Sequence, residues 1–303
     1  MSMPDLWIVV TLAAAVFQTG RFMLQKYLAT ATLSASGATF SRFFYSAPFI
    51  LLLLATYLWL SDLSLPDLAP GFWLYGLMGG TAQILATVCV VLLFKQRNFA
   101  VGITFKKTEV IQTVLMGWVV LGEGVTQLGF AAIALGVVGL LLLSGGPETS
   151  GWRLGDLRNR AAGLGIASGF LFSISAVCYR GASLAVLSDE PVLRASVTLA
   201  AVVSMQTMIM AVWLHYREPG QMRAVWNARR VALWIGLTSM GGSLCWFIAF
   251  TLQNAAYVKA LGQVELLLSI MASTLFFRET ISRREWAGIT VLVSSILMLV
   301  LVI

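Results

Sequence analysis

Hydrophobic residues run through the chain in blocks of about twenty, and short polar stretches separate these blocks. As an α-helix, such a block has the length needed to cross a hydrocarbon core of about 30 Å. Strands of a β-barrel would instead alternate apolar and polar residues over about ten positions, and these blocks do not alternate. Ten helical spans are therefore expected, at residues 5–25, 38–60, 71–94, 99–122, 127–144, 161–181, 193–215, 231–252, 256–277 and 284–303.

The longest polar stretch, residues 144–160, lies near the middle of the chain. It contains Gly and Pro and is rich in Ser, Thr, Asp, Glu and Arg, which is typical of a connection between structural units. We expect a first unit at 1–145, a polar linker at 146–159 and a second unit at 160–303. The first block starts at Asp5 with no basic stretch before it, so it is a poor signal peptide and is expected to be retained.

Composition narrows the class of protein. Of the 303 residues, 59% are hydrophobic and 11% are charged, and the mean hydropathy is +0.87. A soluble domain carries charge on about a quarter of its residues, so this chain has too few charges to cover a water-exposed surface. The net charge of +7 comes from basic residues spread through the connections, where membrane topology explains them. No nucleic-acid partner is therefore expected.

Similar residues recur in the same order in the two halves. Met78-Gly79-Gly80 in the third block recurs as Met240-Gly241-Gly242 in the eighth, and Glu109 in the fourth recurs as Glu265 in the ninth, 156 positions later. A recurring order of this kind favours a duplicated unit of five helices. Because five is odd, the second copy enters the membrane from the opposite side. The expected fold is an all-α membrane protein with ten transmembrane helices in two inverted five-helix repeats.

Short motifs in both halves resemble a known family. They are Leu121-Gly122-Glu123-Gly124-Val125-Thr126-Gln127-Leu128-Gly129 with Gly136-Val137-Val138-Gly139, and Phe277-Arg278-Glu279-Thr280-Ile281-Ser282 with Trp286-Ala287-Gly288. Together with the ten spans and the duplication, they resemble EamA-type transporters of the drug/metabolite transporter superfamily. The resemblance implies that both units are EamA-like and that the protein is a transporter. Members move amino acids, drugs, nucleotide-linked sugars and other small metabolites, so the resemblance does not name a substrate.

Two glutamates are the first candidates for a functional site. Glu109 lies ten residues into its expected span and Glu265 nine residues into its own, which places both near the middle of the membrane. Ionisable groups at that depth are costly and usually face a cavity or a partner. The pair can bind a substrate ammonium or exchange a proton with a coupled cycle. Alternatively, each glutamate is neutralised by a neighbour and only holds helices together; Lys106, three residues before Glu109, is such a neighbour.

Lys106 and Lys107 are the next candidates. Lys106 shares a helix face with Glu109, whereas Lys107 points roughly the opposite way. One lysine can then neutralise Glu109 while the other meets a carboxylate or phosphate of a substrate. In the alternative, the fourth span starts later and both lysines lie at the membrane surface.

Other polar and aromatic residues in the spans have weaker claims. The glutamines that can line a polar cavity, or equally form interhelical hydrogen bonds, are Gln83, Gln112, Gln206 and Gln263. Trp246 lies towards the interior of its span and can contact a substrate. Arg42 and Lys259 lie one turn inside their spans and are expected to extend to the membrane surface.

The sequence gives little support to an enzyme. Cys89, Cys178 and Cys245 lie in separate spans and are interpreted as packing residues, not as disulfides or metal ligands. The single histidine, His215, ends a span beside Tyr216 and Arg217 and is expected at the interface. The sequence has no zinc-protease, nucleophile-elbow or phosphate-loop motif. Neither a catalytic site nor a cofactor is therefore expected.

These observations favour a secondary transporter in the cell (inner) membrane. Because both signs of charge occur at site depth, the expected substrate is a small amphiphilic or zwitterionic metabolite, with amino acids or their derivatives first. The alternatives are a proton-coupled exporter of cationic drugs or amines, and a non-transporting membrane scaffold or channel.

Loop charge predicts the orientation. Connections after the odd-numbered spans carry most of the basic residues, namely Arg21, Lys26, Lys95, Arg97, Arg153, Arg158, Arg160, Arg217, Arg223, Arg229, Arg230, Arg278, Arg283 and Arg284. Connections after the even-numbered spans have only Arg180 and Arg194 at their edges. Because Lys and Arg in short loops stay cytoplasmic, both termini are expected on the exterior or periplasmic side.

Overall fold

The computed structural model describes residues 3–31, 33–94, 105–143, 160–277 and 282–302. Within these ranges the regular elements are α-helices. One isolated β-bridge pairs Leu68 with Val186. The helices of the first half are α1 (Met3–Ala31), α2 (Ala35–Leu60), α3 (Phe72–Phe94), α5 (Glu109–Leu121) and α6 (Gln127–Leu143). Those of the second half are α7 (Arg160–Leu184), α8 (Pro191–Arg217), α9 (Gln221–Asn227), α10 (Arg229–Leu252), α11 (Ala255–Leu261), α12 (Val264–Phe277) and α13 (Arg283–Val302).

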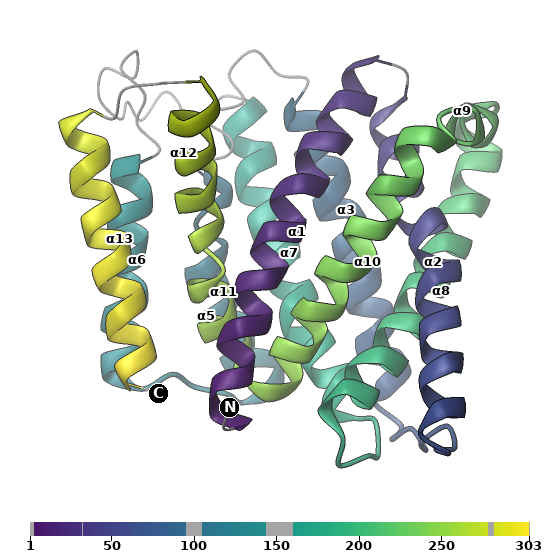
Figure 1. Cartoon of the computed structure of the whole chain (residues 1–303), viewed down its shortest axis with the longest axis horizontal. Helices are drawn as coiled ribbons and strands as arrows, with labels where there is room; N and C mark the ends of the chain where they lie inside the picture. Colours follow the sequence, from purple (N-terminus) through teal and green to yellow (C-terminus); the bar gives the residue numbers. More distant parts are fainter. Residues whose placement is uncertain (1–2, 32, 95–104, 144–159, 278–281, 303) are drawn as a thin grey trace.

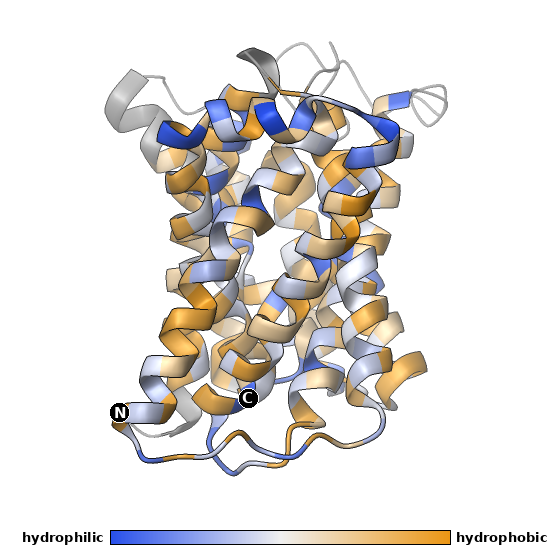
Figure 2. Ribbon diagram, turned by 90° about the vertical axis from the view of Figure 1, so that its right-hand side faces the viewer, coloured by the Kyte–Doolittle hydropathy of each residue, from blue (hydrophilic) through white to orange (hydrophobic). Residues whose placement is uncertain are grey.

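The helices stand roughly side by side, and both ends of the chain lie at the same edge of the molecule (Figure 1). Among the described residues, seven helices are long and apolar enough to cross a membrane, namely α1, α2, α3, α7, α8, α10 and α13. The helices α5 and α6 are shorter but apolar. Figure 2 shows hydrophobic residues along the helices and more hydrophilic ones gathered towards their ends. The protein is thus an all-helical, multi-pass membrane protein.

Local sequence explains where several helices begin and end. The Ser34 hydroxyl accepts a hydrogen bond from the Gly37 amide at the start of α2, and the Asn254 side chain caps α11 in the same way. At α13, Ser282 and Glu285 form a reciprocal capping box. Gly122 ends α5 in the left-handed conformation, with φ of 67°, which a residue with a Cβ rarely adopts.

The ninth expected span is broken, so the prediction of one continuous helix at 256–277 was wrong. α11 ends at Leu261, a turn follows at Gly262–Gln263, and α12 begins at Val264. A Cβ on Gly262 would lie 2.4 Å from the ring of Trp246, so the break coincides with a place where only glycine fits. The fourth span is interrupted in a similar way, because a turn at Lys107–Thr108 precedes α5.

Glycine pairs allow close contacts between helices. α3 packs along α7, where a Cβ on Gly79 would lie 2.9 Å from the ring of Tyr179. α10 packs along α1, where a Cβ on Gly241 or Gly242 would lie 3.0 Å from Phe17. Small residues permit such approach between membrane helices. Both glycine pairs lie inside continuous helices, so they serve packing and do not break the helix.

Candidate functional site

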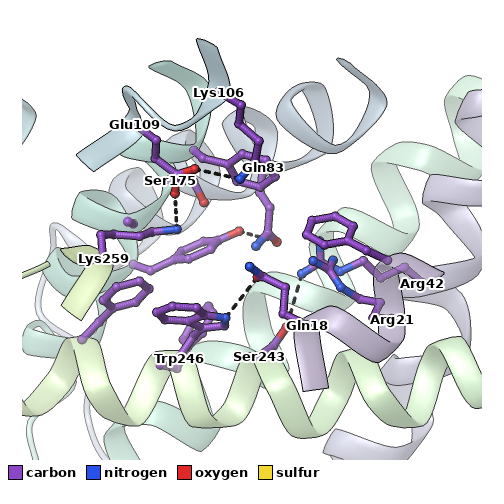
Figure 3. Close-up of a pocket in the computed structure, with 16 residues that line it drawn as sticks. Gln18, Arg21, Arg42, Gln83, Lys106, Glu109, Ser175, Ser243, Trp246 and Lys259 are labelled. Carbon is purple, nitrogen blue, oxygen red and sulfur yellow. Dashed lines mark hydrogen bonds and ion pairs between the residues drawn. The ribbon is translucent and has the colours of Figure 1, made fainter. Parts of the chain in front are cut away.

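A cavity lies at the centre of the bundle, between helices of both halves (Figure 3). The part accessible to water measures about 40 Å³, which is room for a few water molecules. Its polar lining consists of Gln18, Arg21, Arg42, Gln83, Lys106, Glu109, Ser175, Tyr179, Ser243 and Lys259. Its aromatic lining consists of Phe22, Phe172, Trp246, Phe247 and Phe250, along with Tyr179. Charged groups and aromatic rings thus share one small enclosed space.

Glu109 pairs with two lysines. Its carboxylate, on the first residue of α5, is 3.1 Å from the Lys106 ammonium and 2.5 Å from that of Lys259 in α11 (Figure 3). The residue is only 3% exposed, so the ion pairs lie away from bulk water. A carboxylate at a helix N-terminus is also favoured by the partial positive charge there. Glu109 therefore links the first half of the chain to the second through a buried ion pair with Lys259.

Aromatic rings surround the two ammonium groups. Lys106 lies 5.1 Å from the centroid of the Phe172 ring. Lys259 lies 5.1 Å from Trp246 and 5.9 Å from Phe250, which are themselves stacked. Cation–π attraction adds to the ion pairs when water is excluded.

Two arginines line the other end of the cavity (Figure 3). The Arg42 guanidinium donates to three hydroxyls, with distances of 2.8 Å to Ser239, 3.3 Å to Thr87 and 3.3 Å to Ser243. Arg21 is 3% exposed, and its Nη1 has no hydrogen-bond partner. Neither arginine takes part in an ion pair with another described residue.

Gln18 connects the cavity to Glu265. Its amide nitrogen donates to the Glu265 carboxylate at 2.7 Å, and its amide oxygen accepts from the Trp246 indole at 3.2 Å. Glu265 lies in the first turn of α12 and is opposed in charge chiefly by Lys107 and Lys106. It does not itself line the cavity. Glu109 and Glu265 therefore both lie at helix starts, but of these two only Glu109 lines the cavity.

A second polar network surrounds Gln83, which lines the cavity. Gln83 accepts hydrogen bonds from the Tyr179 hydroxyl at 2.9 Å and from the Gln206 amide at 3.0 Å. Gln206 also donates to the Gly80 carbonyl at 3.0 Å, so the network joins α3, α7 and α8.

Of the site residues expected from sequence, Glu109, Lys106, Gln83 and Trp246 line the cavity. The others lie outside its lining: Glu265, Lys107, Gln112 and Gln263. The helix α5 does begin later than expected for the fourth span, but both lysines before it are buried and do not lie at a surface.

Gln112 and Gln263 form local hydrogen bonds. The Gln112 amide donates to the Thr108 hydroxyl at 3.2 Å, and the Gln263 amide donates to the Lys259 carbonyl at 3.2 Å. Both bonds lie within one turn of helix, so neither glutamine links the two halves.

The structure places three basic residues differently from the sequence prediction. Arg42 and Lys259 do not extend to the surface, because hydroxyls on α3 and α10 satisfy Arg42 and Glu109 neutralises Lys259. Arg21 was assigned to a connection, but it is buried inside α1, which continues to Ala31. A usable signal was present: Gln18 and Arg21 are three residues apart and share a face of an otherwise apolar helix.

Glu123 belongs to the first of the two family-like motifs. Its carboxylate accepts from the Arg180 side chain at 2.7 Å and 2.9 Å, which ties the α5–α6 connection to α7. Glu279, in the second motif, lies outside the described residues. The contact of Glu123 with Arg180 is structural, because neither residue is part of the ion pairs around Glu109.

Comparisons with known proteins bear on the second half most directly. The crystal structure of another protein superposes on this chain with a TM-score of 0.71 and covers 98% of this chain and 96% of its own. The two sequences are 15% identical, so this likeness concerns the fold alone. No curated protein matches the sequence. Residues 159–301 match the model of the EamA-like transporter family. Residues 159–301 are therefore an EamA-like transporter domain, of the drug/metabolite transporter superfamily.

Proposed function

We propose that this protein is a secondary transporter that moves a small amphiphilic or zwitterionic metabolite across the cell membrane by alternating access. Amino acids and their derivatives are the favoured class. One observation carries the proposal: the central cavity combines buried charges of both signs with aromatic rings, and both halves of the chain line it. At about 40 Å³ the cavity is too small for such a solute. Binding therefore requires the helices to move apart, as alternating access does.

The repeat hypothesis supports this mechanism. We propose ten spans in two inverted five-helix repeats, at 1–145 and 160–303, with 146–159 as a linker. Under that assignment α3 corresponds to α10 and α7 corresponds to α1, and the α3–α7 contact is then equivalent to the α10–α1 contact. These are the two most extensive helix pairs among the described residues, and each uses one of the recurring glycine pairs.

The interrupted helices support the same assignment. Turns at Lys107–Thr108 and Gly262–Gln263 each precede one of the repeat-related glutamates by no more than two residues. Helices broken near the midplane, with their N-termini at the site, are typical of transporters built from inverted repeats.

A carrier for cationic drugs is the weaker alternative. Its carboxylate would have to be Glu109, the carboxylate that lines the cavity, and this group already pairs with two lysines. A substrate cation would have to displace a lysine and remain near the other one. The proposal therefore retains a substrate with an anionic group.

Counterflow tests the proposal. The purified protein is reconstituted into liposomes that are preloaded with one unlabelled amino acid or its N-acetyl derivative, and the labelled form of the same compound is added outside. A carrier produces transient accumulation of label above equilibrium, which a channel or a scaffold does not. If no compound in a panel of acidic, aromatic and aliphatic amino acids and their N-acetyl derivatives shows accumulation, the proposed function is wrong.

We further propose that both termini face the exterior or periplasm. Arg21 is buried inside α1 and does not count towards a connection. The other described basic residues near the end of the bundle opposite the termini are Lys26, Arg160, Arg217, Arg223, Arg229, Arg230, Arg283 and Arg284. Arg180 and Arg194 lie near the end that holds the termini. Basic connections remain in the cytoplasm, so the imbalance still favours this orientation.

Cysteine labelling in intact cells tests this orientation. In a variant without Cys89, Cys178 and Cys245, an impermeant reagent is expected to label Ser64→Cys, in the α2–α3 connection, and to spare Met222→Cys in α9. Both positions are exposed, so accessibility to the reagent depends on the side of the membrane. Labelling of Met222→Cys with protection of Ser64→Cys would reverse the orientation.

A further inference from the structure

The buried charges around the cavity are mostly positive. Four cations among the described residues are buried, namely Arg21, Arg42, Lys106 and Lys107, whereas Glu109 is the buried carboxylate of that set. Lys259 adds a further cation, with a side chain 13% exposed, and Glu265 a further carboxylate. A buried charge is costly unless a group of opposite sign lies close to it. The excess of positive charge therefore favours a bound anion.

Within the cavity lining, the cations without an ion pair among the described residues are the two arginines. Lys106 and Lys259 both contact the Glu109 carboxylate, which leaves one positive charge between them. Arg42 has only neutral hydroxyl partners, and Arg21 has a buried Nη1 with no hydrogen-bond partner. The Glu265 carboxylate, which accepts a hydrogen bond from Gln18, attracts the charge of Arg21 from a greater distance. Both guanidinium groups line the cavity itself (Figure 3).

The geometry around the arginines suits an oxyanion. A guanidinium presents its donors in a planar fork that matches the oxygens of a carboxylate or phosphate. The Ser243 hydroxyl and the Gln18 amide lie beside the same part of the cavity and can add neutral hydrogen bonds. Trp246, Phe247 and Phe250 present apolar surface to the same cavity.

We propose that Arg21 and Arg42 bind the carboxylate or phosphate of the substrate and that the substrate carries net negative charge. The apolar body of the substrate then lies against the rings of Trp246, Phe247 and Phe250. This inference rests on the proposed transport function and narrows its substrate class. A free amino acid fits less well than an N-acylated or otherwise anionic derivative. Its ammonium would find Glu109 already occupied by Lys106 and Lys259, and both lysines would repel it.

A ligand series with one aromatic body and four head groups tests the inference by calorimetry on the purified protein. 3-Phenylpropionate carries a carboxylate, phenyl phosphate a phosphate, phenylalanine both charges, and phenethylamine only an ammonium. One or both anions are expected to bind more tightly than phenylalanine, and phenethylamine is expected not to bind. The comparison of the first two ligands distinguishes a carboxylate from a phosphate site.

Arg21→Gln is the decisive variant. It removes a buried charge without a hydrogen-bonded counterion, so the variant is expected to fold at least as stably as the original protein. Anion affinity should fall on the order of tenfold to 100-fold, the usual effect of one charged hydrogen bond. Arg223→Gln makes the same chemical change on the exposed face of α9 and should leave anion affinity unchanged.

Three results would overturn the inference. They are tighter binding of phenylalanine or phenethylamine than of both anions, unchanged anion affinity in Arg21→Gln, and failure of both anions to bind at millimolar concentration. Counterflow separates these results from failure of the proposed function. If only zwitterions or cations show counterflow, the proposed transport function stands and the anion site is rejected. If anions bind but no compound shows counterflow, the anion site stands and the transport function is rejected.

Discussion

Glu109→Gln is expected to abolish most of the transport and to lower the stability by about 3–5 kcal/mol, the typical cost of removing one partner of a buried ion pair. The substitution leaves the Lys106 and Lys259 ammonium groups without their shared carboxylate inside a small cavity. It also breaks the ion pair that joins α5 to α11 across the two halves. The measurement is the initial rate of uptake into proteoliposomes, at matched protein content, of a solute that shows counterflow.

Two further variants separate transport from folding. Glu190→Gln makes the same change on an exposed residue before α8 and should transport normally. Glu109→Gln combined with Lys259→Gln restores the formal charge of the cavity, so it should recover part of the lost stability. We expect transport to stay low in the double variant. Normal transport in Glu109→Gln, or full recovery in the double variant, would leave Glu109 with a purely structural role.

Arg180→Met should lower the stability measurably, at a site away from the cavity. The Arg180 side chain donates to both Glu123 carboxylate oxygens, and to the carbonyls of Phe250 and Gln253 at 2.6 Å and 2.8 Å. It thereby ties α7 to the α5–α6 connection and to the end of α10. Losing a charged hydrogen bond costs about 1.5–3 kcal/mol. Because this site is partly exposed, we expect the free energy of unfolding to fall by about 2 kcal/mol.

Thermal unfolding in detergent measures this effect. Arg230→Met is the matched control, because Arg230 is exposed near the start of α10. Equal unfolding temperatures for the two variants would show that the Arg180 hydrogen bonds contribute nothing to stability. A lower temperature for Arg180→Met alone supports a structural clamp between the two halves.

Hydrophobic patterning predicted most of the helical fold, because each membrane-crossing helix needs a long apolar segment and each connection needs polar residues. The described helix ends mostly fall within a few residues of the expected ones, and Ser34, Asn254 and Gly122 mark ends through ordinary capping chemistry. The break at Gly262–Gln263 was missed because its surroundings remain apolar. It coincides with the close approach of Trp246, a residue on a different helix.

The site was predicted only in part, for a similar reason. Glu109 and Lys106 were found because their sequence spacing and depth alone place them together. The burial of Arg42 depends on Ser239 and Ser243, almost 200 residues away, and that of Lys259 depends on Glu109, so distance from a span end misplaced both. Arg21 was counted with the connection after the first span because it lies near the end of the expected span at 5–25, whereas α1 continues to Ala31.

The central claim is that one cavity between the two halves opens in turn to each side of the membrane. Ser243 lines this cavity, so Ser243→Cys, in a variant without the three native cysteines, tests the claim directly. An impermeant thiol reagent is applied to right-side-out and to inside-out membrane vesicles. The account predicts modification from both sides, with slower modification when a bound anion such as 3-phenylpropionate is present. Modification from one side only, in the presence and absence of ligand, would contradict it.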